Sequence, residues 1–148
     1  MTNLIFDTFK LVDNLISKSD SVLILLSRED FCYREQAAFL YESYMASNDF
    51  EEYVRYIDCL KKIKDLEERM TLIRNRCDDT MSQYNILDAN LISARKEILI
   101  GELNDPRMIS LYDIIEINSK NIENLIAETL NFLSDQENLS IIALRTKI

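Results

Sequence analysis

The feature that most constrains this fold is a seven-residue register of apolar side chains running from Tyr56 to Ile98. With Tyr56 at position a, the a and d positions carry Tyr56, Cys59, Ile63, Leu66, Met70, Ile73, Cys77, Thr80, Tyr84, Leu87, Leu91, Ala94, Ile98 and Gly101. A helix cannot bury its own apolar stripe, so a second helix must cover this one. The register therefore predicts an all-α protein of packed helices.

The composition favours the same fold class. The chain has one Gly and one Pro among 148 residues, far below average usage, and these are the residues that most often form turns. A chain of this length can bury a sufficient core without disulfides or metals. We expect residues 1–148 to form a single α-helical domain.

Two helices are expected before the register begins. The first covers about residues 3–18 and ends at a polar bend over residues 17–21. The second covers about residues 28–46 and begins at a variant capping box made by Ser27 and Asp30. Its predicted inner face carries Phe31, Ala38, Tyr41 and Met45.

The later part of the chain predicts two or three further helices. A tight reversal over residues 47–49 precedes the segment 50–100, which is either one continuous helix or a hairpin with its corner at residues 75–80. We favour the hairpin because Asn, Asp and Thr in that stretch are poor helix formers. After a break at residues 101–105, a helix begins at Pro106, reaches about Leu133 and is followed by a short final turn. The expected fold is an antiparallel bundle of four to six helices with a long coiled-coil-like segment.

Charge and cysteine usage limit the expected partners and location. The net charge of −9 disfavours nucleic acid, and acidic proteins more often bind basic or amphipathic partners. No apolar run approaches the roughly 20 residues that a membrane span needs, and no secretory signal is visible. The three cysteines are odd in number and form no Cys-x-x-Cys motif, which is typical of a protein in a reducing compartment. We expect a cytoplasmic protein.

The residue types argue against catalysis. The absence of histidine removes the common nucleophile–base arrangements, the usual zinc sites and the carboxylate–histidine di-iron sites. One glycine cannot build a phosphate-binding loop. A magnesium site made only of carboxylates stays open, but adjacent acidic residues on a helix point about 100° apart and are more often exposed. We predict no enzyme, no cofactor and no metal site.

Two groups of residues are candidates for contact with a partner protein. Aromatic side chains gather around the turn at residues 47–49, and they form either a recognition site or part of the core. In the last long helix, Asn118 interrupts an apolar seam. It either fixes the register of a partner helix or lies at the edge of a broad face. The candidates are Tyr41, Tyr44, Phe50, Tyr53, Asn118, Ile122 and Leu125.

Two short stretches resemble known helical families. Phe39–Tyr41, followed by Asn48–Tyr53 and Tyr56, resembles one helix pair of the tetratricopeptide family, which needs several copies, and the sequence shows no second copy. The stretch 117–130 resembles the C-terminal helix of the flagellar hook-junction export chaperones. That resemblance implies a small, acidic, all-helical protein that holds the amphipathic helix of an export substrate. Neither resemblance assigns the chain to a family.

These features predict a protein that acts by binding another protein. The leading hypothesis is a small acidic adaptor or chaperone whose apolar groove accepts a partner's amphipathic helix. A structural protein that self-assembles through the Tyr56–Ile98 register, for example as a homodimer, is the first alternative. A viral or phage inhibitor that occludes a host protein is the second.

Overall fold

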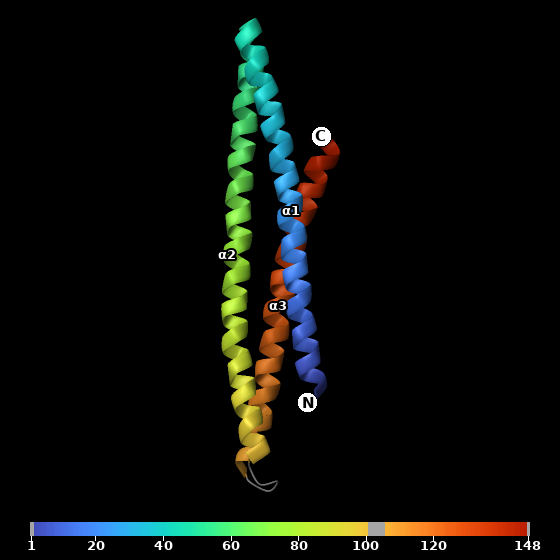
Figure 1. The fold of residues 1–148 in the computed structure, drawn as a ribbon, viewed down its shortest axis with the longest axis vertical. Coiled ribbons are helices and arrows are strands. Elements are labelled where there is room, and N and C mark those ends of the chain that lie inside the picture. Colours follow the sequence, from blue (N-terminus) through green and yellow to red (C-terminus); the bar gives the residue numbers. More distant parts are fainter. Residues whose placement is uncertain (1, 101–105, 148) are drawn as a thin grey trace. The chain divides into compact units, whose positions relative to one another are not determined.

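A computed structural model describes residues 2–100 and 106–147, and it describes side chains over 10–99 and 109–146. Within these ranges the chain forms three helices, α1 (Thr2–Ser47), α2 (Phe50–Ile100) and α3 (Pro106–Lys147) (Figure 1). All described residues except Asn48 and Asp49 are helical. The all-α prediction is confirmed, but the predicted count of four to six helices is wrong.

The count was too high because the predicted interior breaks do not break the helices. The bend at 17–21, the capping site at Ser27 and Asp30, the corner at 75–80 and the final turn after Leu133 all lie inside continuous helices. Ser, Asp, Asn and Thr each cost a helix less than about 1 kcal/mol relative to Ala, and packing along the helix offsets that cost. The predicted break at 101–105 lies outside the described residues.

The reversal at residues 47–49 is confirmed, and its geometry joins α1 to α2 through only two residues. Asn48 takes the left-handed conformation with φ of 55°, and its amide donates to the Tyr44 carbonyl over 2.8 Å. Asn tolerates this conformation better than most residues, so it ends α1 as glycine does elsewhere. Asp49 then caps α2, because its Oδ1 accepts a 3.0 Å hydrogen bond from the Glu51 amide.

The residues fall into two compact units, and each unit contains one part of α1, one part of α2 and one part of α3. Unit 1 comprises Met1–Lys18 and Arg76–Phe132, and unit 2 comprises Ser19–Asn75 and Leu133–Ile148. In unit 2, α1 and α2 run antiparallel and are joined by the turn at Asn48 (Figure 1). The expectation of a single domain over 1–148 stays a prediction.

The predicted register forms the buried face of α2. Among the described a and d positions from Tyr56 to Ile98, all are buried or half-buried, and Ile73 and Leu91 are almost fully enclosed. Gly101, the last predicted d position, lies outside the described residues. The 3.5-residue average spacing keeps these side chains on one face of the long helix, as expected for a helix packed in a bundle.

The predicted inner face of α1 is wrong, because all four of its residues, Phe31, Ala38, Tyr41 and Met45, are exposed. Phe31 and Met45 are 60% and 61% exposed, and the core of unit 2 instead takes Tyr33, Ala37 and Leu40. On α3 the expected apolar seam is buried at Leu111, Ile115 and Ile122, and Ser119, Ile126, Thr129 and Leu133 are buried as well. α1 carries apolar residues on several of its sides, so its contacts with the other helices decide which side is buried.

A polar cluster lies inside unit 2 and connects its three helices. Arg69 on α2 donates to the side-chain oxygen of Gln136 over 2.7 Å and to Ser140 Oγ over 3.2 Å. Ser140 donates to Glu29 Oε2 on α1 over 2.8 Å, and the Arg69 guanidinium lies 3.8 Å from the same carboxylate oxygen. Glu29 and Ser140 are buried, so these contacts satisfy groups that water does not reach.

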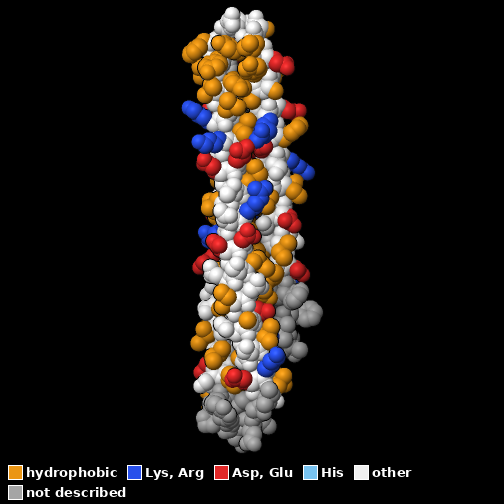
Figure 2. All heavy atoms as spheres, turned by 60° about the vertical axis from the view of Figure 1, so that its left-hand side comes forward, with side chains coloured by type: hydrophobic (Ala, Val, Ile, Leu, Met, Phe, Trp, Pro, Cys, Tyr) orange, Lys and Arg blue, Asp and Glu red, His pale blue; other side chains and the backbone are white. Residues whose placement is uncertain are grey.

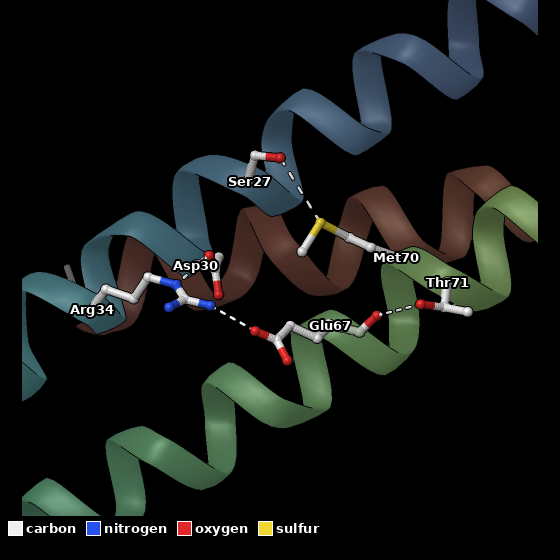
Figure 3. A network of polar contacts seen from close by, with 6 residues as sticks. All are labelled: Ser27, Asp30, Arg34, Glu67, Met70 and Thr71. Atoms are coloured by element: carbon white, nitrogen blue, oxygen red, sulfur yellow. Dashed lines mark hydrogen bonds and ion pairs between the residues drawn. The ribbon is translucent and has the colours of Figure 1, made fainter.

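Two further polar contacts join α1 to α2 in unit 2 (Figure 3). Arg34 donates from Nε to Asp30 Oδ2 over 2.8 Å and from Nη2 to Glu67 Oε1 over 2.6 Å. The hydrogen bond with Asp30 is the main cause that raises the pKa of Arg34. Ser27 Oγ lies 3.8 Å from Met70 Sδ across the same pair of helices. These contacts fix the alignment of the two helices that meet at the turn.

Candidate functional site

Aromatic rings from α1 and α2 form one connected group beside the turn. Tyr53 lies at its centre, with ring centroids 5.1 Å from Tyr44, 6.2 Å from Phe50 and 6.4 Å from Tyr56. Tyr41 extends the group through Tyr56 at 5.5 Å. All four pairs have centroid distances within the range of about 4.5–7 Å at which aromatic rings attract one another, which contributes about 0.5–1.5 kcal/mol per pair. The rings therefore hold one another in place.

Much of this group and of its apolar surroundings is exposed. We call the surface formed by Tyr41, Tyr44, Met45, Phe50, Tyr53, Val54 and Tyr56 the aromatic tip. Phe50 is 71% exposed, Met45 61% and Val54 50%, and hydrophobic side chains merge into one area at this end of α1 and α2 (Figure 2). With 150–250 Å² for a whole aromatic side chain, the exposed apolar area is on the order of 500 Å². That size is typical of the largest, often functional, patch on a monomer.

Acidic side chains border the aromatic tip. From Tyr41 to Tyr56 the chain carries Glu42, Asp49, Glu51 and Glu52 against one base, Arg55, a formal net charge of −3. Glu42, Asp49 and Glu51 are exposed, and no ion pair neutralises them among the described residues. Glu52 is half-buried, and its Oε2 is enclosed without a hydrogen-bond partner in the described part of the chain. The surface combines exposed rings with uncompensated negative charge.

The structure brings together four of the seven predicted contact residues. Tyr41, Tyr44, Phe50 and Tyr53 all belong to the aromatic tip, where three are exposed and Tyr44 is half-buried. These side chains are positioned by the two-residue turn, because it brings the end of α1 against the start of α2. Whether they bind a partner stays a prediction.

The other three predicted contact residues lie on α3 in unit 1, and their role in binding stays a prediction. Ile122 is 0% exposed, so its side chain is not accessible to a partner. Asn118 is half-buried and donates to the Ile114 carbonyl of its own helix over 2.8 Å, an arrangement that needs no second helix. Leu125 is half-buried and lines a shallow hollow of about 380 Å³ with Gln83 and Asn124.

A second, more apolar hollow lies in unit 2. It has a volume of about 620 Å³ and is lined mainly by α1 residues, including Ile24, Phe31 and Cys32, with Leu144 from α3. It lacks the connected rings and the dense charge that mark the aromatic tip. Phe31 in this hollow therefore offers a matched comparison for Phe50, since both are exposed phenylalanines in unit 2.

Sequence reasoning missed Met45, Val54 and Tyr56 as members of the aromatic tip, and Glu52 at its border. The register contained a signal for two of them, because extending it backward from Tyr56 places Val54 at the outward f position and Glu52 at the inward d position. A carboxylate at d explains why one Glu52 oxygen is enclosed. Met45 carried no comparable signal, since its exposure depends on which side of α1 is packed.

Comparison with protein-family models, curated proteins and solved structures found no match for the chain. Among the described residues, no group of three or more potential metal-ligating side chains comes together. Within the same residues, no helix has both the length and the apolar character needed to cross a membrane.

Proposed function

We propose that this chain is a non-enzymatic adaptor or chaperone that binds another protein through the aromatic tip. The observation that carries the proposal is the exposed group of connected rings at the turn between α1 and α2. Aromatic side chains are enriched among the residues that contribute most to protein–protein binding.

The rigidity of the aromatic tip supports a role in binding. A partner that docks on a surface must offset the entropy lost when side chains become ordered, about 0.5–1.5 kcal/mol for each flexible side chain. Tyr53 is already held between Tyr44, Phe50 and Tyr56, so less entropy is lost when a partner binds it. A turn of two residues with its own cap leaves the ends of both helices little freedom.

The alternative of self-assembly through the Tyr56–Ile98 register has less support. Residues of that register are buried or half-buried against the chain's own helices, so they offer little apolar surface to a second copy. The aromatic tip overlaps the register at Tyr56 alone, and most of its apolar side chains are exposed. An inhibitor that occludes a target protein would use the same surface and differ only in the target.

Site-specific photocrosslinking in the source cells tests the proposal. A photoreactive phenylalanine analogue replaces Phe50 in one protein and Phe31 in a matched control, since these residues are 71% and 60% exposed. We expect the Phe50 position to crosslink one protein reproducibly and the Phe31 position to leave it uncrosslinked. With the analogue at Tyr53, Phe50→Ser should reduce that product strongly, while Phe31→Ser should preserve it.

Two results would contradict the proposal. If crosslinking occurs equally from Phe31, the hollow of α1 rather than the aromatic tip contacts the partner. If Phe50→Ser leaves the product from Tyr53 unchanged while circular dichroism shows an intact helical fold, the tip contributes nothing to binding.

A further inference from the structure

We infer that the partner of the aromatic tip is a basic amphipathic helix, which presents Lys or Arg beside its apolar face. This inference rests on the proposed function and specifies the chemistry of the partner. It follows from three features of the tip: its uncompensated acidic residues, its exposed aromatic rings and its helical backbone.

The charge of the tip favours a basic partner. Four carboxylates against one guanidinium lie between Tyr41 and Tyr56, and Glu42 and Glu51 are exposed on either side of the turn. Glu52 adds an enclosed carboxylate oxygen without a hydrogen-bond partner among the described residues. Complementary charge speeds association and excludes partners of like charge. An ammonium or guanidinium group from the partner would also neutralise carboxylates that the tip itself leaves unpaired.

The exposed rings favour the same cations. Lys and Arg are attracted to the faces of Tyr and Phe within about 6 Å of the ring centre. The chain already uses this contact, with Lys62 Nζ 5.3 Å from the Tyr33 ring and the Arg76 guanidinium 5.0 Å from the Phe132 ring. At the tip, Phe50 and Tyr41 are exposed without such a cation in the described structure.

The backbone of the tip favours a helix as the bound element. The turn joins two helices, so the tip has no strand edge on which an extended peptide could add main-chain hydrogen bonds. A helix satisfies its own backbone and needs only side-chain contacts with Phe50, Met45 and Val54. Two tips would each bring a net charge of −3 to a shared interface, so a second copy is a worse fit. The same charge disfavours an anionic membrane surface.

Fluorescence anisotropy with two synthetic helices of about four turns tests this inference. One peptide has leucine on its apolar face and lysine on its polar face, and in the second every lysine is replaced by glutamate. We expect the lysine peptide to bind the full chain with an affinity that weakens as salt rises, and the glutamate peptide not to bind. Phe50→Ser should weaken binding at least tenfold, and Phe31→Ser should change it less than twofold.

A charge-matched pair of variants separates local from general attraction. Glu42→Gln with Glu51→Gln removes two charges from the tip, and Glu97→Gln with Glu123→Gln removes two exposed charges from unit 1. The first double variant should weaken binding of the lysine peptide about three- to tenfold, and the second less than twofold. Equal weakening by both would overturn the inference, because the attraction would then come from net charge.

The outcomes also separate this inference from the proposed function. If both peptides bind equally and Phe50→Ser weakens both, the tip binds helices without regard to charge, and only the inference fails. If Phe50→Ser changes the binding of neither peptide, the peptides do not dock on the aromatic tip, and the proposed function fails together with this inference. Dimerisation or binding to zwitterionic vesicles that Phe50→Ser abolishes would identify a second copy or a membrane as the occupant and overturn the inference.

Discussion

Replacing Arg69 with methionine should lower the free energy of unfolding by about 3 kcal/mol. Methionine retains the apolar stem but removes the guanidinium that contacts Gln136, Ser140 and Glu29. The Glu29 side chain is 5% exposed, so its carboxylate would stay buried and, among the described residues, would keep the Ser140 hydroxyl as its one remaining partner. Burial lowers the pKa of the Arg69 guanidinium from its ordinary value, and the Glu29 carboxylate opposes that shift.

The magnitude follows from the burial of the two partners. Removing one member of a buried ion pair costs about 3–5 kcal/mol, because the remaining charge is uncompensated. The Arg69 side chain is 23% exposed, so water weakens its part of the pair and places the cost at the lower end of that range. Glu29→Gln in the Arg69→Met background should restore more than half of the loss, since the amide keeps a hydrogen-bonding group beside Ser140 without the charge.

Urea unfolding followed by circular dichroism measures these changes, with Arg74→Met as the control. Arg74 lies on the same helix but is exposed, so its replacement should change stability little. The reasoning is refuted if Arg69→Met costs less than about 1 kcal/mol, or if adding Glu29→Gln destabilises the protein further instead of restoring stability.

Four other changes test separate parts of the structure. Thr80→Val should lower the free energy of unfolding by about 1 kcal/mol, because the Thr80 and Thr129 hydroxyl oxygens lie 2.8 Å apart in a buried site. In urea unfolding, the variant with valine at both positions should lose less stability than the sum of the two single variants. Asn48→Gly should preserve the melting temperature, whereas Asn48→Val should lower it, because φ is 55° at this position. Burial raises the pKa of Tyr33 above its ordinary value of 10. The neutral phenol therefore contributes fully to stability below pH 10, and this contribution is lost as the pH rises further. In urea titrations at increasing pH, Tyr33→Phe should show a smaller fall in the free energy of unfolding above pH 10. Burial likewise raises the pKa of the Cys59 thiol, and mass mapping should find it the slowest of the three cysteines to react with a maleimide.

The predictions that succeeded rested on spacing within one helix. The register on α2 correctly identified Cys59, Leu66 and Ile73 as buried, because a long helix with one apolar stripe has only one side to bury. The reversal before Phe50 was also predictable, since Asn and Asp favour the end of one helix and the start of the next. Four aromatic residues of the tip were found for the same local reason.

The predictions that failed depended on neighbouring helices. Phe31 shows the error, because it was expected inside and is 60% exposed. α1 carries apolar residues on more than one side, so its own periodicity does not choose between sides. The polar contacts of Glu29 with Ser140, more than 100 residues apart in sequence, had no local signal at all.

The sequence by itself determined that the chain is helical, that α2 buries the Tyr56–Ile98 register and that aromatic residues gather at a turn. These properties follow from side-chain spacing and backbone preference over a few residues. Only the tertiary structure decided that polar stretches continue as helix, which side of α1 is buried, and that the tip leaves Phe50 and Met45 exposed. Those outcomes depend on which side chains from other helices reach each site, because burial is a property of the packed assembly and not of one segment.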